Sequence, residues 1–348
     1  MNPHPHPPLT QAPDVPPPGG LRAIVEQTRA LAERGRHGAL ALVVATRGST
    51  YRKPGALILL DTDGVRVGAL SGGCLEGELE TQARRVIDTG LAMDAHFDTS
   101  GDEDRVFGSG TGCGGSIRLL LLPLPPQASP LRDALIDAHA RGLALALRLV
   151  DTDAQRGAGV ARVGEAAYAF DRSGAPASAA DESTMDIRMA IAPAPRLLLL
   201  GAGPETRPVL CLTRMLGWRV ELIERRERWA RFAEGCGIDR MHRVGTDALP
   251  ALLAQTAFDA ALTMNHNVHL DALGLTHLAA SAVPYIGLLG PARRRDDLLA
   301  EVGADIAAAL QPRLRAPIGL PLGGEGAEAI ALAIVAQLQE YFSRHAAR

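Results

Sequence analysis

Cysteine is scarce in this chain and never closely paired. The chain has four cysteines in 348 residues, and they are Cys74, Cys113, Cys211 and Cys236. This number and spacing exclude a disulfide scaffold, and the absence of a C-x-x-C pair excludes the common structural zinc sites. We therefore predict four reduced thiols.

Long apolar segments and an excess of charge of either sign are also missing. The longest apolar runs, such as 197–200, are far shorter than a membrane span requires. The first 20 residues are rich in proline and do not join a basic region to an apolar one, so residues 1–20 are predicted to be a disordered tail and the protein to be cytoplasmic. A net charge of -3 gives no reason to expect binding to nucleic acid or to membranes.

What is present predicts an α/β protein with two domains. A helix and several short apolar runs separated by turns indicate a mixed α/β domain with a β-rich sheet over residues 21–171. The stretch 172–194 is rich in Ala, Ser and Pro and is predicted to be mainly a linker, with one short ordered piece at most. Strands and helices then alternate over 195–345, which predicts a Rossmann-like, doubly wound parallel sheet.

The turn 48–56 of the first domain is a candidate anion site. It places Arg52 beside Lys53, the only lysine of the chain, and adds two hydroxyl groups. Such a group could hold a phosphate. A solvated hairpin turn also explains it, and from chemistry alone that explanation is the more common one.

A second candidate lies at a predicted helix start. Gly72 and Gly73 precede Cys74 and Glu76, so backbone N–H groups and the positive end of the helix can face an anion or a thiolate. A cysteine in this position is more nucleophilic than one in a core. Cys74 is therefore a candidate for handling sulfur.

The third candidate is the glycine-rich segment 108–115. It has five glycines in eight residues, and Cys113 stands immediately before Gly114 and Gly115. This composition predicts exposed or closely approached backbone around the thiol. A simpler alternative stays open for both cysteines of these segments, which is that they are small buried hydrophobic residues.

The second domain has a nucleotide-type loop with unusual details. Gly201 and Gly203 lie where a dinucleotide-binding loop belongs, and Glu224 ends the next strand, where an acid would bind ribose. Thr206 replaces the third glycine, and Glu205 adds negative charge beside a would-be pyrophosphate. We expect a modified site and do not expect ordinary NAD(P) binding.

His266 follows the third strand of this domain, at the edge of the sheet where ligands bind in such folds. It could donate a hydrogen bond to a ligand or move a proton. A structural histidine beside the next helix explains the position equally well.

Taken in order, these segments resemble the XdhC/CoxI family of xanthine dehydrogenase accessory proteins over nearly the whole chain after residue 20. The resemblance implies an XdhC/CoxI-type N-terminal domain followed by a Rossmann-like XdhC domain. The segments that carry it are 48–56, 72–78, 113–115, 201–203, 264–266, 285–290, and 317–320 with 328–332.

The resemblance implies a chaperone for a cofactor rather than an enzyme. The family is associated with binding the molybdenum cofactor (molybdopterin) transiently, with protecting it while a cysteine desulfurase provides sulfur, and with inserting it into a xanthine dehydrogenase-type molybdenum hydroxylase apoenzyme. Cys74 or Cys113 would then contact molybdenum or carry a persulfide. The residues implied to bind the cofactor are Arg52, Lys53, Gly72, Gly73, Cys74, Glu76, Cys113, Gly114, Gly115, Gly201, Gly203, Glu224 and His266.

Two other functions stay open. The Rossmann-like domain is also compatible with an NAD(P)-dependent oxidoreductase, and the chain could be a structural assembly factor that docks the hydroxylase without touching the cofactor. The last helix is apolar enough to pack on a sheet or on a partner. Because chaperones of this kind present paired sites, we further expect a homodimer.

Overall fold

The computed structural model describes residues 15–73, 75–98, 115–178 and 182–345. Its contacts divide the chain between Ala194 and Pro195 into an N-terminal unit, 19–194, and a C-terminal unit that also includes the first 18 residues. Most of the predicted tail, 1–14, lies outside the described residues. In the remaining part, the carbonyl oxygen of Pro16 accepts a hydrogen bond of 2.9 Å from Arg214 Nε.

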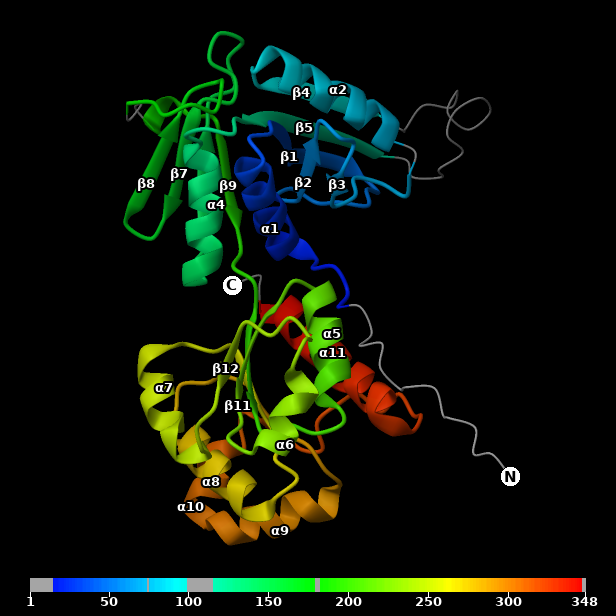
Figure 1. The fold of residues 1–348 in the computed structure, drawn as a ribbon, viewed down its shortest axis with the longest axis vertical. Coiled ribbons are helices and arrows are strands. Elements are labelled where there is room, and N and C mark those ends of the chain that lie inside the picture. The colour runs from blue at the N-terminus through cyan, green and yellow to red at the C-terminus, as the bar shows by residue number, and fades with distance from the viewer. Residues whose placement is uncertain (1–14, 74, 99–114, 179–181, 346–348) are drawn as a thin grey trace, which may run out of the picture. The chain divides into compact units, whose positions relative to one another are not determined.

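The N-terminal unit contains two antiparallel sheets. Its helices are α1 (Gly20–Glu33), α2 (Glu76–Thr89), α4 (Pro130–Arg141) and the short 3-10 helix η1 (Glu182–Thr184). Its strands are β1 (Gly38–Gly48), β2 (Leu57–Asp61), β3 (Arg66–Val67), β4 (Met93–Asp98), β5 (Gly115–Leu124), β6 (Leu145–Leu149), β7 (Gly159–Val163), β8 (Ala166–Phe170) and β9 (Ile187–Ile191). The strand order is β3-β2-β1-β5-β4 in the first sheet and β8-β7-β6-β9 in the second (Figure 1).

The first sheet is buried on both faces. Side chains of a strand alternate between the two faces, so Leu40 and Leu42 of β1 join the core shared with α1 and α4. Ala39 and Ala41 point to the opposite face, where they pack in the core to which α2 contributes Leu79. This double burial explains why β1 is a continuous apolar run rather than an alternating one.

The segment predicted to be a linker contributes a strand to the second sheet. β9 pairs with β6 along its whole length, from Ile187 opposite Leu149 to Ile191 opposite Leu145. The prediction of a linker with one short ordered piece is therefore corrected in one respect, because that piece is a strand of the N-terminal unit. The strand was not predicted because it is only five residues long and lies among Ala, Ser and Pro residues. Its apolar alternation consists of Ile187, Met189 and Ile191.

The C-terminal unit is a doubly wound parallel sheet, which confirms the predicted fold class. Its strands are β10 (Arg196–Leu200), β11 (Arg219–Ile223), β12 (Arg240–His242), β13 (Ala260–Thr263), β14 (Ile286–Leu288) and β15 (Leu314–Arg315). Its helices are α5 (Thr206–Met215), α6 (Glu227–Ala230), η2 (Arg231–Ala233), η3 (Thr246–Ala248), α7 (Leu249–Gln255), α8 (Val268–Ala279), α9 (Ala292–Val302), α10 (Ala304–Leu310) and α11 (Gly326–His345). The strand order is β12-β11-β10-β13-β14-β15, and every pair is parallel.

Helices cover both faces of this sheet. Leu197 and Leu199 of β10 lie in the core that contains residues of α5 and α11. Leu198 and Leu200 point to the other core, which contains residues of α7, α8, α9 and α10. The strand order reverses at β10, so the carboxyl ends of β11, β10 and β13 are neighbours, and ligands bind at this position in such folds.

Candidate functional site

Three predicted segments of the N-terminal unit meet at one end of the first sheet. β1 ends at Gly48 and β5 begins at Gly115, and these two glycines are paired. A Cβ on Gly115 would stand 2.5 Å from the carbonyl oxygen of Ser49, so this approach of two backbones requires glycine. Arg52 Nε donates to the carbonyl oxygen of Ala69 at 2.7 Å, which joins the turn to the loop before α2.

The two cations of the turn differ in their surroundings. Arg52 is half-buried and held by its bond to Ala69, whereas Lys53 is exposed. The ammonium group of Lys53 forms no ion pair with any residue that the structure describes. Thr50 Oγ1 donates to the carbonyl oxygen of Arg52 at 2.8 Å and fixes the turn. Lys53 is therefore the cation of this turn that is available to an anion.

Glu76 organises the loop before α2. Its buried carboxylate accepts hydrogen bonds from the backbone N–H groups of Leu70 and Ser71, at 3.2 and 2.9 Å, and from the Ser71 hydroxyl. The same hydroxyl accepts the N–H groups of Gly73 and Leu75, at 3.1 and 3.2 Å. The carboxylate of Glu76 thus supports the loop from inside.

Of the two glycines of this loop, only Gly73 is required by its backbone conformation. Gly73 has a φ of 123°, which disfavours any other residue, whereas no atom lies within 4 Å of where a Cβ would stand on Gly72 or Gly73. Both are exposed, so the space beside them is open. Three further predicted contacts, Cys74, Cys113 and Gly114, lie outside the described residues.

Acid should weaken the N-terminal unit through Glu76. Burial raises the pKa of Glu76, but the hydrogen bonds from Ser71 and Leu70 outweigh it and hold the pKa below its ordinary value of 4.5. The unfolded chain therefore binds a proton more readily, so this contribution to stability is complete above about pH 4.5 and is lost as the pH falls through the lower folded pKa.

We accordingly expect Glu76→Gln to lower the free energy of unfolding near neutral pH by about 1–3 kcal/mol and to reduce its decline in acid. Denaturant unfolding at a series of pH values measures both effects. Glu78→Gln, an exposed position on the same helix, is the matched control. An equal acid dependence in wild type and Glu76→Gln would contradict this role.

The glycine loop of the C-terminal unit uses its own donors. A dinucleotide-binding loop offers its N–H groups to a pyrophosphate. Here the N–H groups of Gly201, Ala202 and Gly203 donate, in that order, to the Ile223 carbonyl, the Glu224 carboxylate and the Thr206 hydroxyl, at 2.9, 3.1 and 2.9 Å. None of these three N–H groups is left for a phosphate in this structure.

Glu224 is also fully engaged. Arg226 donates from Nε to Glu224 Oε1 at 2.8 Å and from Nη2 to Oε2 at 2.6 Å. The same arginine donates from Nη1 to the carbonyl oxygen of Asn265 at 3.1 Å. Burial raises the pKa of Glu224, but the hydrogen bonds from Arg226 outweigh it and lower the pKa. The carboxylate that would bind ribose is thus a buried partner of arginine.

His266 lies directly over the glycine loop. It is the one residue other than glycine with a positive φ, 51°, among those the structure describes. Its Nε2 is 3.2 Å from Glu205 Oε2, and a Cβ on Gly203 would stand 2.3 Å from the same nitrogen. The imidazole is nearly parallel to the ring of Trp229, at 15° and a centroid distance of 6.0 Å. A histidine and a carboxylate thus lie above Gly203, where a pyrophosphate would approach this loop.

Family models match both units of the chain. The XdhC Rossmann domain matches residues 197–338, and the XdhC and CoxI family matches residues 31–98. The chain belongs to the XdhC/CoxI family.

Two relatives that match nearly the whole of this XdhC-family chain have names that refer to xanthine dehydrogenase. A Bacillus subtilis protein named as a probable subunit of xanthine dehydrogenase is 26% identical over 329 residues, which cover 89% of this chain and 94% of that protein. A crystal structure described as a xanthine dehydrogenase from Bacillus halodurans has a TM-score of 0.73 and 26% identity, and the match covers 92% of this chain and 96% of that one. The similarity therefore extends over both units.

Several residues of the XdhC Rossmann domain were not predicted from the sequence. Arg226 and Trp229 follow β11, and the buried Asp271 accepts hydrogen bonds from the backbone and side chain of Asn265. Asp271 also forms an ion pair of 2.7 Å with Arg294, the middle one of three consecutive arginines. The ion pair of Arg226 with Glu224 had one signal in the sequence, which is that Arg226 stands two residues after Glu224.

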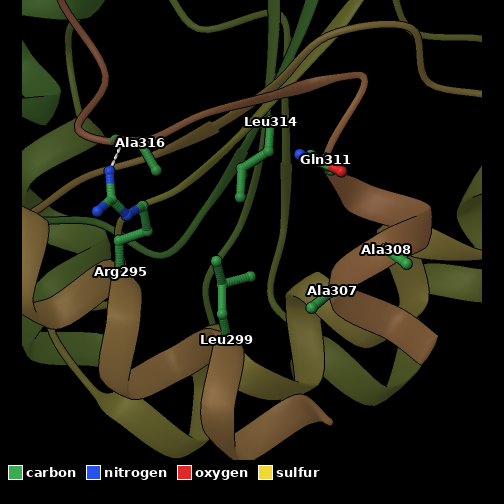
Figure 2. Close-up of a pocket in the computed structure, with 7 residues that line it drawn as sticks. All are labelled: Arg295, Leu299, Ala307, Ala308, Gln311, Leu314 and Ala316. Carbon is green, nitrogen blue, oxygen red and sulfur yellow. Dashed lines mark hydrogen bonds between the residues drawn. The ribbon is translucent and has the colours of Figure 1, made fainter. Parts of the chain in front are cut away.

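The cavity at the expected nucleotide position of this XdhC Rossmann domain is small. Beside Glu224 and Asn265, where ribose would lie, the cavity is about 50 Å³, whereas ligand pockets usually span about 300–1,000 Å³. A larger pocket of about 460 Å³ lies between α9 and α10. Figure 2 shows Arg295 on one side of it and Gln311 on the other, with the guanidinium of Arg295 bonded to the carbonyl of Ala316. No residue predicted to bind the cofactor lines this pocket.

Among the residues that the structure describes, no three side chains of His, Cys, Asp or Glu are grouped closely enough to hold a metal ion. No helix there is long and apolar enough to cross a bilayer.

Proposed function

We propose that this XdhC-family chain is an accessory protein in the maturation of xanthine dehydrogenase or a related molybdenum hydroxylase. In this role it binds the molybdenum cofactor, protects it during sulfuration and delivers it to the apoenzyme. The proposal is supported by two relatives whose names refer to xanthine dehydrogenase and whose similarity extends over nearly the whole chain. The observation that carries it is the meeting of three segments at one end of the first sheet, through Gly48 with Gly115 and Arg52 with Ala69.

The chemistry of that sheet end suits a phosphorylated ligand. Lys53 supplies an exposed positive charge, and the exposed backbone at Gly72 and Gly73 allows a ligand to approach closely. Cys74 directly follows these glycines, and Cys113 stands two residues before Gly115. Both thiols are thus neighbours in sequence of residues at this sheet end, and thiolates are ligands that soft partners such as molybdenum prefer.

The proposal assigns no turnover to this chain. A cysteine desulfurase provides the sulfur, and the two proteins meet in the cytoplasm. The homodimer is proposed from the family resemblance alone, because the apolar residues of α11, such as Ile334 and Leu338, pack in the core of their own unit. An NAD(P)-dependent oxidoreductase is disfavoured because the N–H groups of Gly201, Ala202 and Gly203 and the carboxylate of Glu224 already have partners within the protein.

The test is anaerobic binding of the molybdenum cofactor to the wild-type protein and to Cys74→Ala and Cys113→Ala, with NAD titrated in parallel. We expect binding by the wild type that weakens about tenfold or more in at least one variant, since a sulfur contact to a metal contributes more than about 1.4 kcal/mol. Cys211→Ala, a thiol of the C-terminal unit, is the control and should bind as the wild type does.

Other outcomes have definite meanings. NAD binding without cofactor binding would move the function to the Rossmann domain and overturn the proposal. Unchanged binding in both cysteine variants would remove the thiols from the site. No cofactor binding, together with maturation of the hydroxylase, would favour a structural assembly factor.

A further inference from the structure

The second sheet of the N-terminal unit buries one face and exposes the other. Side chains of a strand alternate between the two faces, and Leu145, Leu147 and Leu149 of β6 lie in the core shared with α4. The side chains that point away from this core form the outer face of the sheet. This outer face presents three alanines and three arginines, which are Ala146, Ala167, Ala190, Arg148, Arg162 and Arg188. Arg148 is half-buried, and the other five are exposed.

Strand pairing brings the three arginines together. Arg148 of β6 stands directly opposite Arg188 of β9. Arg162 of β7 stands opposite Ala146, two residues before Arg148, so Arg162 and Arg148 are diagonal neighbours. Side chains in opposite positions lie about 5 Å apart and diagonal ones about 7–8 Å apart. The three guanidinium groups are therefore close enough to meet one ligand.

A single carboxylate pairs with two of these arginines. Glu182 of η1 accepts a hydrogen bond of 2.9 Å from Arg162 Nε and forms an ion pair of 3.2 Å with Arg148 Nε. The hydrogen bond from Arg162 lowers the pKa of Glu182 below its ordinary value, so this carboxylate is ionised at neutral pH. Arg188 forms no ion pair with any described residue, although Asp186 stands two residues before it.

This arrangement lowers the stability of the sheet when no anion is present. Like charges in directly opposite positions repel each other, and Glu182 compensates Arg148 but not Arg188. Departures of this kind from local stability rules are typical of functional positions. Guanidinium groups bind carboxylates through two parallel hydrogen bonds, and the small side chains of Ala146 and Ala190 leave room for an extended segment to lie against the sheet.

We propose that the outer face docks an acidic segment of a partner protein, with carboxylates of that segment on Arg148 and Arg188. Glu182, Asp186 and the exposed Glu165 between β7 and β8 disfavour nucleic acid, because surfaces that bind nucleic acid are much more strongly positive. A segment whose carboxylates are separated by uncharged residues is the better fit. The proposal goes beyond the proposed function, because it concerns a protein partner and does not require cofactor binding.

The test uses a short labelled peptide of alternating Glu and Ala, in which the carboxylates of an extended chain lie on one side. Fluorescence anisotropy with the full chain at low salt should show saturable binding that weakens as salt is added. We expect Arg148→Gln and Arg188→Gln each to weaken binding about threefold, and the double variant about tenfold. Arg84→Gln, an exposed arginine of α2 in the same unit, is the matched control and should leave affinity unchanged.

Stability separates docking from a structural role. Because Arg188→Gln removes a repulsion, it should not lower the denaturation midpoint, whereas loss of a structural arginine would. No binding of the acidic peptide at millimolar concentration, or equal binding of a Gln-Ala peptide, overturns the proposal. Equal losses in Arg84→Gln and Arg188→Gln also overturn it, as does tighter binding of a single-stranded oligonucleotide of the same charge. Cofactor binding that depends on Cys74 or Cys113 can survive each of these results, so the proposed function is tested separately.

Discussion

Arg226→Ala lowers the free energy of unfolding of the C-terminal unit by about 3 kcal/mol, because it leaves the buried carboxylate of Glu224 without its charged partner. Glu224 is 4% exposed and depends on Arg226 for two charge-assisted hydrogen bonds. The side chain of Arg226 is itself 27% exposed, so we expect the lower end of the range for a broken buried pair. Chemical denaturation followed by circular dichroism measures the loss.

A double-mutant cycle isolates this pair. Adding Glu224→Gln to Arg226→Ala should restore part of the stability, because the uncompensated charge is removed. Arg228→Ala changes an exposed arginine two residues away and should cost less than about 0.5 kcal/mol. Additive effects of Arg226→Ala and Glu224→Gln would contradict the assigned ion pair.

Gly201→Ala is expected to lower the free energy of unfolding by about 3–5 kcal/mol or to prevent folding of the C-terminal unit. Gly201 has a φ of 87°, and a Cβ there would stand 2.4 Å from the Cα of Asn265. Backbone strain alone would cost about 1–2 kcal/mol. The rest comes from the displaced Asn265, whose movement also disturbs its hydrogen bonds to Asp271.

Gly235→Ala separates strain from the clash. Gly235 has a similar φ, 69°, but no atom lies within 4 Å of where its Cβ would stand. Gly235→Ala should therefore lower the free energy of unfolding by only about 1–2 kcal/mol in the same denaturation experiment. If the two alanine variants lost equal stability, the close approach of Asn265 to Gly201 would not be what requires the glycine.

The fold could be predicted where the pattern of apolar residues is long and regular. The run 197–200 and the segments after it alternate strand with helix, and this pattern alone predicts a parallel sheet. β9 and β15 could not be predicted in this way. β9 has five residues among Ala and Pro, and β15 has two, so neither has enough apolar positions to show a strand pattern. Their pairing depends on neighbours distant in sequence, β6 and β14.

The candidate sites show the same limit. One glycine of each loop is visible in the sequence and is required by its backbone conformation, Gly73 in the first loop and Gly201 in the second. The partner of a carboxylate is not visible, because it depends on the folded chain. Glu224 in the sequence suggests a ribose contact, whereas in the structure it is bound by Arg226 and Ala202.

The measurement that most directly tests the account is reconstitution of xanthine dehydrogenase from its cofactor-free apoenzyme. Molybdenum cofactor is supplied either free or loaded on this chain, with a cysteine desulfurase and its cysteine substrate present in both cases. A chaperone role predicts several-fold more active, sulfurated dehydrogenase from the loaded chain, and loss of that advantage in Cys74→Ala or Cys113→Ala. Equal yields from free and chain-bound cofactor would contradict the chaperone role.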